Sequence, residues 1–262
     1  MTAGVPISFV TANYVARETG WAMQGWGHGD RATNDHFRPL GTFGARLGEL
    51  LGDVRTLGFD TIDLWGAHLN PAWATDEHLA IARDLLAQHE LHVASLAAWV
   101  DADTIERACE IALGVGTAII GGGTSADPGA IVPVLRERGV RLAIENHPEK
   151  TPDELLAKIA AGDGTLGATV DTGWWATQGY DAARAIEELG ERALHVHLKD
   201  VVAVGEPQET CRWGEGIVPI EGCVRALRKQ GYAGAISIEH EPERYDPSDD
   251  CRAMLATLRG WL

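Results

Sequence analysis

The sequence predicts a single-domain (β/α)8 barrel, in which eight parallel strands each precede a helix, over residues 1–262. Three observations lead to this fold class. Short apolar, β-branched runs alternate with helical patterns along the whole chain, without a change in composition. The runs are continuously apolar, as expected for parallel strands that are buried on both faces. The length is close to the ~250 residues typical of such a barrel.

The expected elements follow one another in strand–helix order. The strands are expected at residues 5–10, 59–65, 91–97, 116–120, 141–145, 166–171, 194–199 and 235–239. Helices are expected at residues 42–57, 75–89, 103–113, 180–189, 220–230 and 248–259, and from residues 127 and 151 onward. Glycine, which favours the backbone conformation that ends a helix, follows four of them at Gly58, Gly114, Gly190 and Gly231. An open, doubly wound sheet is the alternative fold, disfavoured because no GxGxxG loop follows the first strand.

Residues 12–42 are expected to form a long loop without secondary structure of its own. The stretch is rich in glycine and contains Trp26 and His28. A loop of this length in a compact domain is usually functional. We therefore expect it to cover the barrel mouth and to bring Trp26 or His28 into the pocket.

Four side chains that bind metals well stand at the ends of four consecutive expected strands. They are Glu145, Asp171, His197 and Glu239. The carboxyl ends of barrel strands converge on one mouth, and charges that follow apolar runs need a partner or a metal. Three carboxylates and one imidazole suit an octahedral ion with open positions better than a closed structural zinc. We therefore expect one divalent ion, with Mn²⁺ favoured over Mg²⁺ and Co²⁺.

Three basic side chains near these positions have more than one interpretation. His195 shares a strand face with His197, and only one can lie at the height of the metal; His195 is expected to be an interior histidine with a hydrogen-bond partner. Lys199 either points into the mouth and holds a substrate oxygen, or pairs with Asp200 at the rim. His147 is either a general base or a rim residue.

Aromatic residues are concentrated on the expected catalytic face. Of nine tryptophans, those in expected loops or at strand ends are Trp26, Trp65, Trp99, Trp174, Trp175 and Trp213. Aromatic rings stack on the C–H faces of sugars, and their burial energy is large. We expect at least two to line the pocket and others to pack loops against the barrel. The residues expected to contact a carbohydrate substrate are Trp26, His28, His68, Trp99, Trp174 and Arg212.

Charge and cysteine content exclude several classes of function. The net charge is −16 and no basic cluster is visible, which argues against nucleic acid as a partner. The four cysteines form no CxxC pair, which favours a reducing compartment. No signal-like start and no apolar run near the ~20 residues of a membrane span is present. We expect a cytoplasmic protein with a small-molecule substrate; a homo-oligomer or a small partner subunit is left open.

Five short motifs stand at the expected strand ends. They are Ile144-Glu145-Asn146, Val170-Asp171-Thr172-Gly173, His195-Val-His197-Leu-Lys199-Asp200, Gly214-Glu-Gly216 and Ser237-Ile-Glu239-His240-Glu241. Together they resemble the xylose-isomerase-like sugar phosphate isomerase/epimerase superfamily of TIM barrels, over essentially the whole chain. The resemblance implies the same barrel, metal ligands at the four positions above, and Mn²⁺, Mg²⁺ or Co²⁺ as the ion. Trp174 stands where many ketose 3-epimerases and related endonucleases have histidine, and no arginine closely follows His197, which argues against those two activities.

The resemblance implies a metal-dependent isomerase or epimerase that acts on a keto-sugar or related polyol through an enediolate, with Glu145 and Glu239 as bases. The alternative is a lyase or dehydratase acting on a 3-keto-glycoside or an inosose, similar to C-glycoside deglycosidases or cyclitol dehydratases. A non-catalytic sugar-binding barrel would keep the aromatic residues but need not keep four metal ligands. A metal-dependent phosphodiesterase is disfavoured by the acidic charge and by Trp174.

Overall fold

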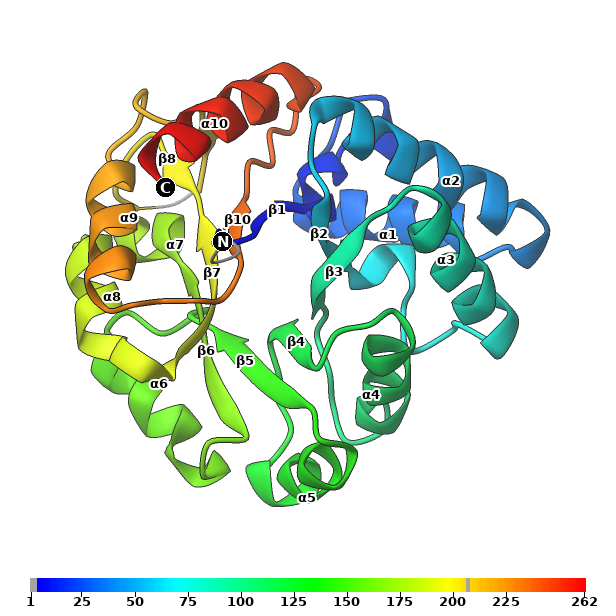
Figure 1. Cartoon of the computed structure of the whole chain (residues 1–262), viewed down its shortest axis with the longest axis horizontal. Coiled ribbons are helices and arrows are strands. Elements are labelled where there is room, and N and C mark those ends of the chain that lie inside the picture. Colours follow the sequence, from blue (N-terminus) through cyan, green and yellow to red (C-terminus); the bar gives the residue numbers. More distant parts are fainter. Residues whose placement is uncertain (1–3, 206–207) are drawn as a thin grey trace.

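The computed structural model describes residues 4–205 and 208–262 (Figure 1). Parallel strands close into a barrel in the order β1-β10-β7-β6-β5-β4-β3-β2, and the helices surround them. Barrel neighbours are therefore successive in the sequence, as short right-handed strand–helix–strand connections require. The predicted (β/α)8 fold class is confirmed.

The barrel strands match the predicted strands to within a few residues at each end. They are β1 (Ile7–Val10), β2 (Thr61–Trp65), β3 (His92–Ala97), β4 (Ile119–Gly122), β5 (Arg141–Glu145), β6 (Leu166–Asp171), β7 (Ala193–Leu198) and β10 (Ile236–Ile238). Two further strands, β8 (Asp200–Val201) and β9 (Thr210–Cys211), form a separate antiparallel pair after β7.

The helices begin and end largely where the caps predict. They are α1 (Trp26–Phe37), α2 (Leu40–Leu57), α3 (Asp76–Gln88), α4 (Ile105–Gly114), α5 (Pro128–Arg138), α6 (Pro152–Ile159), α7 (Thr172–Thr177), α8 (Ala182–Leu189), α9 (Ile220–Lys229) and α10 (Ser248–Trp261). The side chains of Asp127 and Thr151 accept backbone N–H groups at the starts of α5 and α6. Gly58, at φ +97°, ends α2.

The prediction of a structureless loop at residues 12–42 is wrong. This stretch contains two 3₁₀ turns, η1 (Thr11–Tyr14) and η2 (Arg17–Thr19), and the helix α1. One of its glycines, Gly29, is required by close packing. A Cβ atom on Gly29 would lie 2.6 Å from the carbonyl oxygen of Val15, so glycine lets α1 pack directly against the turn that precedes it. Glycine lowers the helical propensity of the stretch, and tertiary packing overrides that preference.

The interior of the barrel contains a polar layer. Buried polar side chains project into it from several strands, among them Ser8, Asp63, His195 and Ser237. Asp63 Oδ2 lies 2.8 Å from His195 Nε2. Because β1 and β10 separate β2 from β7 in the barrel, this hydrogen bond crosses the interior. The hydrophobic core lies between the strands and the helices, where Phe9, Ile62, Leu142, Val170 and Ile238 are buried.

Two further features of the chain bear on the expectations from sequence. All four cysteines are free, and Cys109, Cys223 and Cys251 are buried. Within the described residues, every helix is too short or too polar to cross a bilayer.

Candidate active site

The carboxyl ends of the barrel strands open into a cavity of about 780 Å³. This volume lies within the range of roughly 300–1,000 Å³ that is usual for small-molecule sites. Strands β5, β7 and β10 and the segments after them supply most of the ionisable lining side chains, which are Glu145, His147, His197, Lys199, Glu239, Glu241 and Glu243. Asp30 of α1 lines the cavity from the other side. Tryptophans form much of the remaining wall, namely Trp26, Trp65, Trp99 and Trp174.

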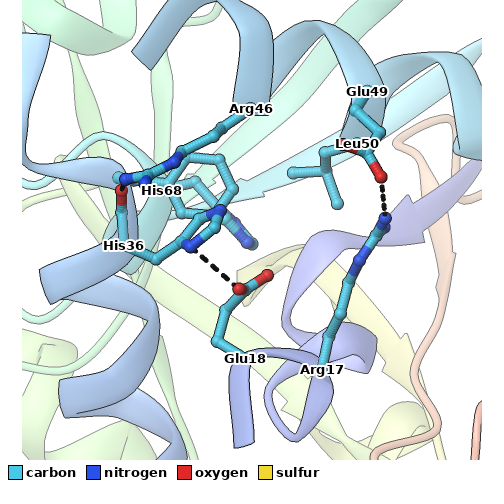
Figure 2. Close-up of a pocket in the computed structure, with 8 residues that line it drawn as sticks. Arg17, Glu18, His36, Arg46, Glu49, Leu50 and His68 are labelled. Carbon is cyan, nitrogen blue, oxygen red and sulfur yellow. Dashed lines mark hydrogen bonds and ion pairs between the residues drawn. The ribbon is translucent and has the colours of Figure 1, made fainter. Parts of the chain in front are cut away.

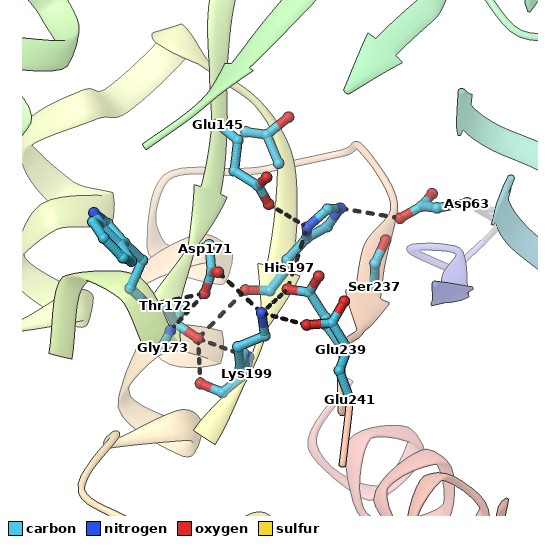
Figure 3. A network of polar contacts seen from close by, with 12 residues as sticks. Asp63, Glu145, Asp171, Thr172, Gly173, His197, Lys199, Ser237, Glu239 and Glu241 are labelled. Carbon is cyan, nitrogen blue, oxygen red and sulfur yellow. Dashed lines mark hydrogen bonds and ion pairs between the residues drawn. The ribbon is translucent and has the colours of Figure 1, made fainter. Parts of the chain in front are cut away.

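Three of the four predicted metal ligands converge in this cavity (Figure 3). Glu145 ends β5, His197 belongs to β7, and Glu239 directly follows β10. One ligand atom from each lies within 4.8 Å of the others. His197 Nδ1 is 2.8 Å from Glu145 Oε1 and 3.4 Å from Glu239 Oε2. Two carboxylates and one imidazole at this spacing can hold a divalent cation.

The polar partners of these residues leave bonding capacity for a cation. Glu239 Oε2 lies 3.2 Å from Lys199 Nζ as an ion pair, yet no hydrogen bond from residues 4–205 or 208–262 reaches this buried oxygen. A buried charge requires a paired charge or a metal. Burial raises the pKa of Glu145, but His147 and His197 outweigh burial and hold that pKa below its ordinary value. The donor set is therefore anionic and fits a hard divalent ion.

Asp171, the fourth predicted ligand, lies beside this cluster and outside the group of three. Its Oδ1 accepts the backbone N–H groups of Gly173 and Trp174 at the start of α7. Its Oδ2 is 3.2 Å from His147 Nε2 and 3.3 Å from Lys199 Nζ. The role of Asp171 as a metal ligand stays a prediction, and it requires Oδ2 to exchange one of these contacts for the ion.

Short motifs after β5 and β6 hold the ends of three neighbouring strands together. The Asn146 side chain donates to the Asp171 carbonyl oxygen at 3.0 Å and accepts the Asp171 N–H at 2.7 Å. The Thr172 hydroxyl donates to the Lys199 carbonyl oxygen at 2.8 Å and accepts the Lys199 N–H at 2.9 Å. A Cβ atom on Gly173 would lie 2.7 Å from Lys199 Cγ, so glycine makes room for the lysine side chain.

Lys199 points into the barrel mouth, the first of the two alternatives that the sequence left open. Its Nζ lies 2.9 Å from Glu241 Oε2, in addition to its contacts with Glu239 and Asp171. Burial lowers the pKa of Lys199, but these carboxylates outweigh burial and raise the pKa well above its ordinary value. The ammonium therefore stays charged and neutralises part of a strongly acidic site.

Asp200 does not pair with Lys199 and instead organises the loop after β7. Its carboxylate accepts backbone N–H groups from Val201, Gly214, Gly216 and Val218. A Cβ atom on Gly216 would lie 2.3 Å from Asp200 Oδ1. Glycine at position 216 therefore lets the backbone approach this carboxylate closely, and Gly214 adopts a positive φ of +90°.

Glu241 is an ionisable residue of the cavity that stands in one of the sequence motifs but was not predicted as a site residue. It lies two residues beyond Glu239 and faces the same Lys199 ammonium. Burial and the nearby Glu239 outweigh the attraction of Lys199 and raise the pKa of Glu241 to about 8. Glu241 lies two residues after Glu239, and side chains at that spacing in an extended chain point the same way, so the sequence could have indicated it.

His147 lies in the cavity between two carboxylates. Its Nδ1 is 3.7 Å from Glu145 Oε2, its Nε2 contacts Asp171, and its ring packs edge-on against Trp174 at a centroid distance of 4.5 Å. Burial lowers the pKa of His147, but Glu145 and Asp171 outweigh burial and raise that pKa above its ordinary value. Each ring nitrogen faces a carboxylate, so this geometry favours His147 as a proton donor or a substrate-orienting residue over a base.

Asp63 on β2 was not predicted from the sequence. The expected interior histidine, His195, has Asp63 as its partner, and Asp63 Oδ2 is also 3.4 Å from His197 Nε2. Asp63, His195 and His197 form a second buried group whose ligand atoms lie within 4.8 Å of one another. Burial raises the pKa of Asp63, but the two histidines outweigh burial and lower that pKa far below its ordinary value. The sequence could have indicated Asp63, because it is the single acidic residue in the largely apolar strand β2.

Three of the predicted substrate contacts line the cavity, namely Trp26, Trp99 and Trp174. Trp26 is 45% exposed and Trp99 is 61% exposed, so both offer free ring surface at the cavity. A Cβ atom on Gly123 would lie 2.2 Å from the Trp99 ring, so the glycine that directly follows β4 lets this indole lie against the backbone.

The other predicted contacts lie elsewhere. His28 accepts the N–H of Gln24 at the start of α1 and is not among the cavity-lining residues. Arg212 is exposed and lies 4.0 Å from Asp250. Trp175 is buried in the core, and Trp213 stacks on Trp261 at a centroid distance of 6.1 Å. These aromatic residues pack loops and helices against the barrel, as the sequence led us to expect for some of them.

His68 lines a second, smaller cavity of about 210 Å³ between α1, α2 and η2 (Figure 2). Its Nδ1 is 3.1 Å from the Thr11 hydroxyl, which itself accepts the Trp65 N–H. Burial, with Arg17 and His36, lowers the pKa of His68 to about 3. His68 is thus a neutral packing residue that is not among those lining the large cavity. The charges around it are largely paired, since Arg17 contacts Glu49 and Asp53.

Comparison with known proteins agrees with this architecture. A family model described as a xylose isomerase-like TIM barrel matches residues 129–261. The chain belongs to this family. An uncharacterised protein of Methanocaldococcus jannaschii is 31% identical over 120 residues, which are 42% of this chain and 40% of that protein. The match therefore spans less than half of that relative's length.

Several solved structures share the fold at low identity. The probable 3-DHS dehydratase AsbF of Bacillus anthracis superposes with a TM-score of 0.70 at 15% identity, over 97% of this chain and 98% of that one. The D-allulose 3-epimerase of Methylomonas sp. gives 0.69 at 16% identity, over 98% of each chain. A xylose isomerase-like TIM barrel protein of Mycobacterium smegmatis, in complex with magnesium, gives 0.68 at 19% identity, over 99% and 98%. At these identities the likeness establishes a shared fold.

Proposed function

We propose that this chain is a divalent-metal-dependent sugar isomerase or epimerase that acts on a keto-sugar or related polyol through an enediolate. The observation that carries the proposal is the group formed by Glu145, His197 and Glu239, whose ligand atoms lie within 4.8 Å of one another on the floor of a large cavity. Asp171 is proposed as a fourth ligand and Mn²⁺ as the preferred ion. A carbohydrate is the proposed substrate because aromatic rings stand beside charged groups.

The charged residues would divide the chemistry between them. A bound divalent ion would act as a Lewis acid on the substrate carbonyl. Glu239 and Glu145 supply carboxylates that would remove the proton next to the carbonyl and return it to another carbon or another face. The Lys199 ammonium would hold a substrate oxygen, and its contacts with three carboxylates fix its position. His147 would orient a substrate hydroxyl as a donor.

A lyase or dehydratase of the same superfamily is the second candidate. His147 favours it, because a proton donor beside the proposed bases could protonate a departing hydroxyl or glycosidic oxygen. The Lys199 ammonium, which keeps its proton, would stabilise negative charge on that oxygen. The similarity in fold to a probable dehydratase agrees with this candidate. Both candidates begin with removal of the same α-proton and differ only in the later steps of the reaction.

The deciding experiment monitors that shared step. The Mn²⁺-loaded protein is given a panel of ketoses, inososes and 3-keto-glycosides in D₂O, and deuterium uptake is measured by NMR. Uptake with a rearranged sugar as product supports the isomerase or epimerase. Uptake with loss of water or an aglycone supports the lyase. Sugar binding without any uptake across the panel would contradict both and would favour a non-catalytic sugar-binding barrel.

A further inference from the structure

His197 has two faces, and a different anion contacts each of them. Its Nδ1 points to Glu145 and Glu239 in the cavity. Its Nε2 points to Asp63 Oδ2, 3.4 Å away below the cavity floor. Figure 3 shows the imidazole between Glu145 and Asp63. In the part of the chain that the structure describes, this buried Nε2 makes no hydrogen bond, and its 3.4 Å contact with Asp63 is an ion pair.

Asp63 is fixed in place by residues that have no contact with the cavity. Its Oδ1 accepts the Ser8 hydroxyl at 3.1 Å, and its Oδ2 is 2.8 Å from His195 Nε2. The Ser237 hydroxyl lies 3.2 Å from the same His195 nitrogen. Asp63, Ser8 and Ser237 are fully buried. A carboxylate held from both sides in a packed barrel interior cannot turn to another partner without breaking buried hydrogen bonds.

We propose that Asp63 is a positioning residue that holds the His197 proton on Nε2 and so presents Nδ1 to the metal site. This inference rests on the proposed metal-dependent function. A histidine that binds a metal through one nitrogen generally donates the other N–H to a carboxylate or carbonyl, which fixes its tautomer and ring orientation. Here the Nδ1 proton that bonds Glu145 must leave when an ion binds, while the Nε2 proton stays with Asp63.

The geometry separates this role from that of an ordinary interior ion pair. An aspartate present only to stabilise His195 would need one histidine within reach. Asp63 instead contacts both histidines through the same oxygen, and the second is the imidazole of the proposed metal cluster. Asp63 itself is outside the cavity lining, so it acts through His197 and touches no substrate.

The first test measures binding of Mn²⁺ alone by titration calorimetry. Asp63→Asn keeps the shape but replaces one acceptor oxygen by a donor, so we expect its Mn²⁺ affinity to fall about 10- to 100-fold. Ser8→Ala is the matched control, because it removes the bond to Oδ1 and leaves the oxygen that faces His197. Its affinity should stay within about threefold of the parent. An unchanged affinity in Asp63→Asn, or an equal loss in Ser8→Ala, would overturn the proposal.

The second test needs no variant and detects the proton directly. In ¹⁵N NMR spectra of the parent protein, His197 should carry its proton on Nε2 when Mg²⁺ is bound, and this N–H should also be protected from exchange without metal. A proton on Nδ1 in the Mg²⁺ form would contradict the proposal even if Asp63→Asn fails to fold. If the parent binds neither ion but shows a protected Nε2–H that Asp63→Asn loses, the proposed function fails and the positioning by Asp63 stands.

Discussion

The two sides of the cavity are lined by different kinds of residues. Strands β5, β6, β7 and β10 bring acids and bases to their carboxyl ends, and Glu145, Asp171, Lys199 and Glu239 form one connected network. Strands β1 to β4 contribute small residues, backbone and tryptophan rings to the same cavity. Two acids also lie on that side: Asp30 of α1 lines the cavity, and Asp63 lies outside the cavity lining.

This difference suggests a division of labour. Side chains that exchange protons or bind an ion must be positioned to within about 0.5 Å, and rigid strand ends can hold them in that way. Aromatic surfaces act over a larger area and tolerate the looser placement of loops and of the start of α1. Changes on the charged side should therefore affect chemistry, and changes on the aromatic side should affect binding.

Removal of the metal tests the charged side as a whole and should have the largest effect. After treatment with a chelator, α-proton exchange should fall by at least about 10³-fold, because Lewis-acid stabilisation contributes several kcal/mol. Added Mn²⁺ should restore it. Circular dichroism should show that the chelated protein stays folded. If protein that elemental analysis shows to be metal-free still exchanges α-protons at the parent rate, the charged side does not act through a metal.

Replacing single carboxylates tests the two proposed bases. Glu145→Gln and Glu239→Gln should each lower turnover by about 10²–10⁴-fold, because an amide is a poor base. Metal binding should weaken but persist at millimolar Mn²⁺, since the amide oxygen is still a ligand. His147→Ala is the control and should cost less, because contacts with Glu145 and Asp171 raise the pKa of His147 and so disfavour the neutral form that a base requires. If both Gln variants exchange α-protons at the parent rate with metal bound, these carboxylates are not the bases.

The aromatic side is tested at Trp99, whose ring is 61% exposed at the cavity. Trp99→Ala should raise KM up to about tenfold, since an aromatic contact contributes roughly 0.5–1.5 kcal/mol beyond buried area. It should leave kcat within about twofold. Trp213→Ala is the matched control, because that ring stacks on Trp261 outside the cavity lining. A large loss of kcat with unchanged KM in Trp99→Ala would contradict the proposal that the aromatic side serves binding and the charged side serves chemistry.

His68 tests which residues belong to the site, because it was expected to bind substrate but lines the smaller cavity. His68→Gln should leave kcat/KM nearly unchanged. The pKa of His68 is lowered to about 3 in the folded protein. Above about pH 6.5, the pKa of histidine in the unfolded chain, the side chain is neutral in both states and does not oppose folding.

The same residue predicts a change in stability with pH. As the pH falls below about 6.5, the unfolded chain gains a proton that the folded one does not, and stability is lost. Between pH 7 and 5 the parent should lose about 2 kcal/mol more unfolding free energy than His68→Gln. Urea denaturation at the two values measures this. Equal losses would show that His68 titrates normally in the fold.

The charged side could be predicted from sequence because its pattern is local. A buried run that ends in an acid, repeated on successive strands, places each side chain at the same end of the barrel. This pattern led to Glu145, His197 and Glu239. It did not lead to Glu241, which lies beyond the predicted strand, or to Asp63, whose histidine partners are 132 and more residues away in sequence.

The aromatic side was harder to predict, because its positions depend on packing between distant segments. The glycines of α1 suggested a loop, and the close approach of Gly29 to Val15, which explains one of them, is visible only in the structure. His28 and Arg212 stand in polar, aromatic stretches but point elsewhere. Whether a tryptophan lines a cavity or fills the core, as Trp99 and Trp175 respectively do, depends on helix orientations that composition does not encode.

The most direct test is to locate the ion itself. A crystal grown with Mn²⁺ and measured at the manganese edge gives an anomalous map that needs no substrate. The account predicts one peak within bonding distance of His197 Nδ1, Glu145 and Glu239, with Asp171 Oδ2 turned toward it. A peak between Asp63 and His195, or no peak in this cavity at saturating Mn²⁺, would contradict it.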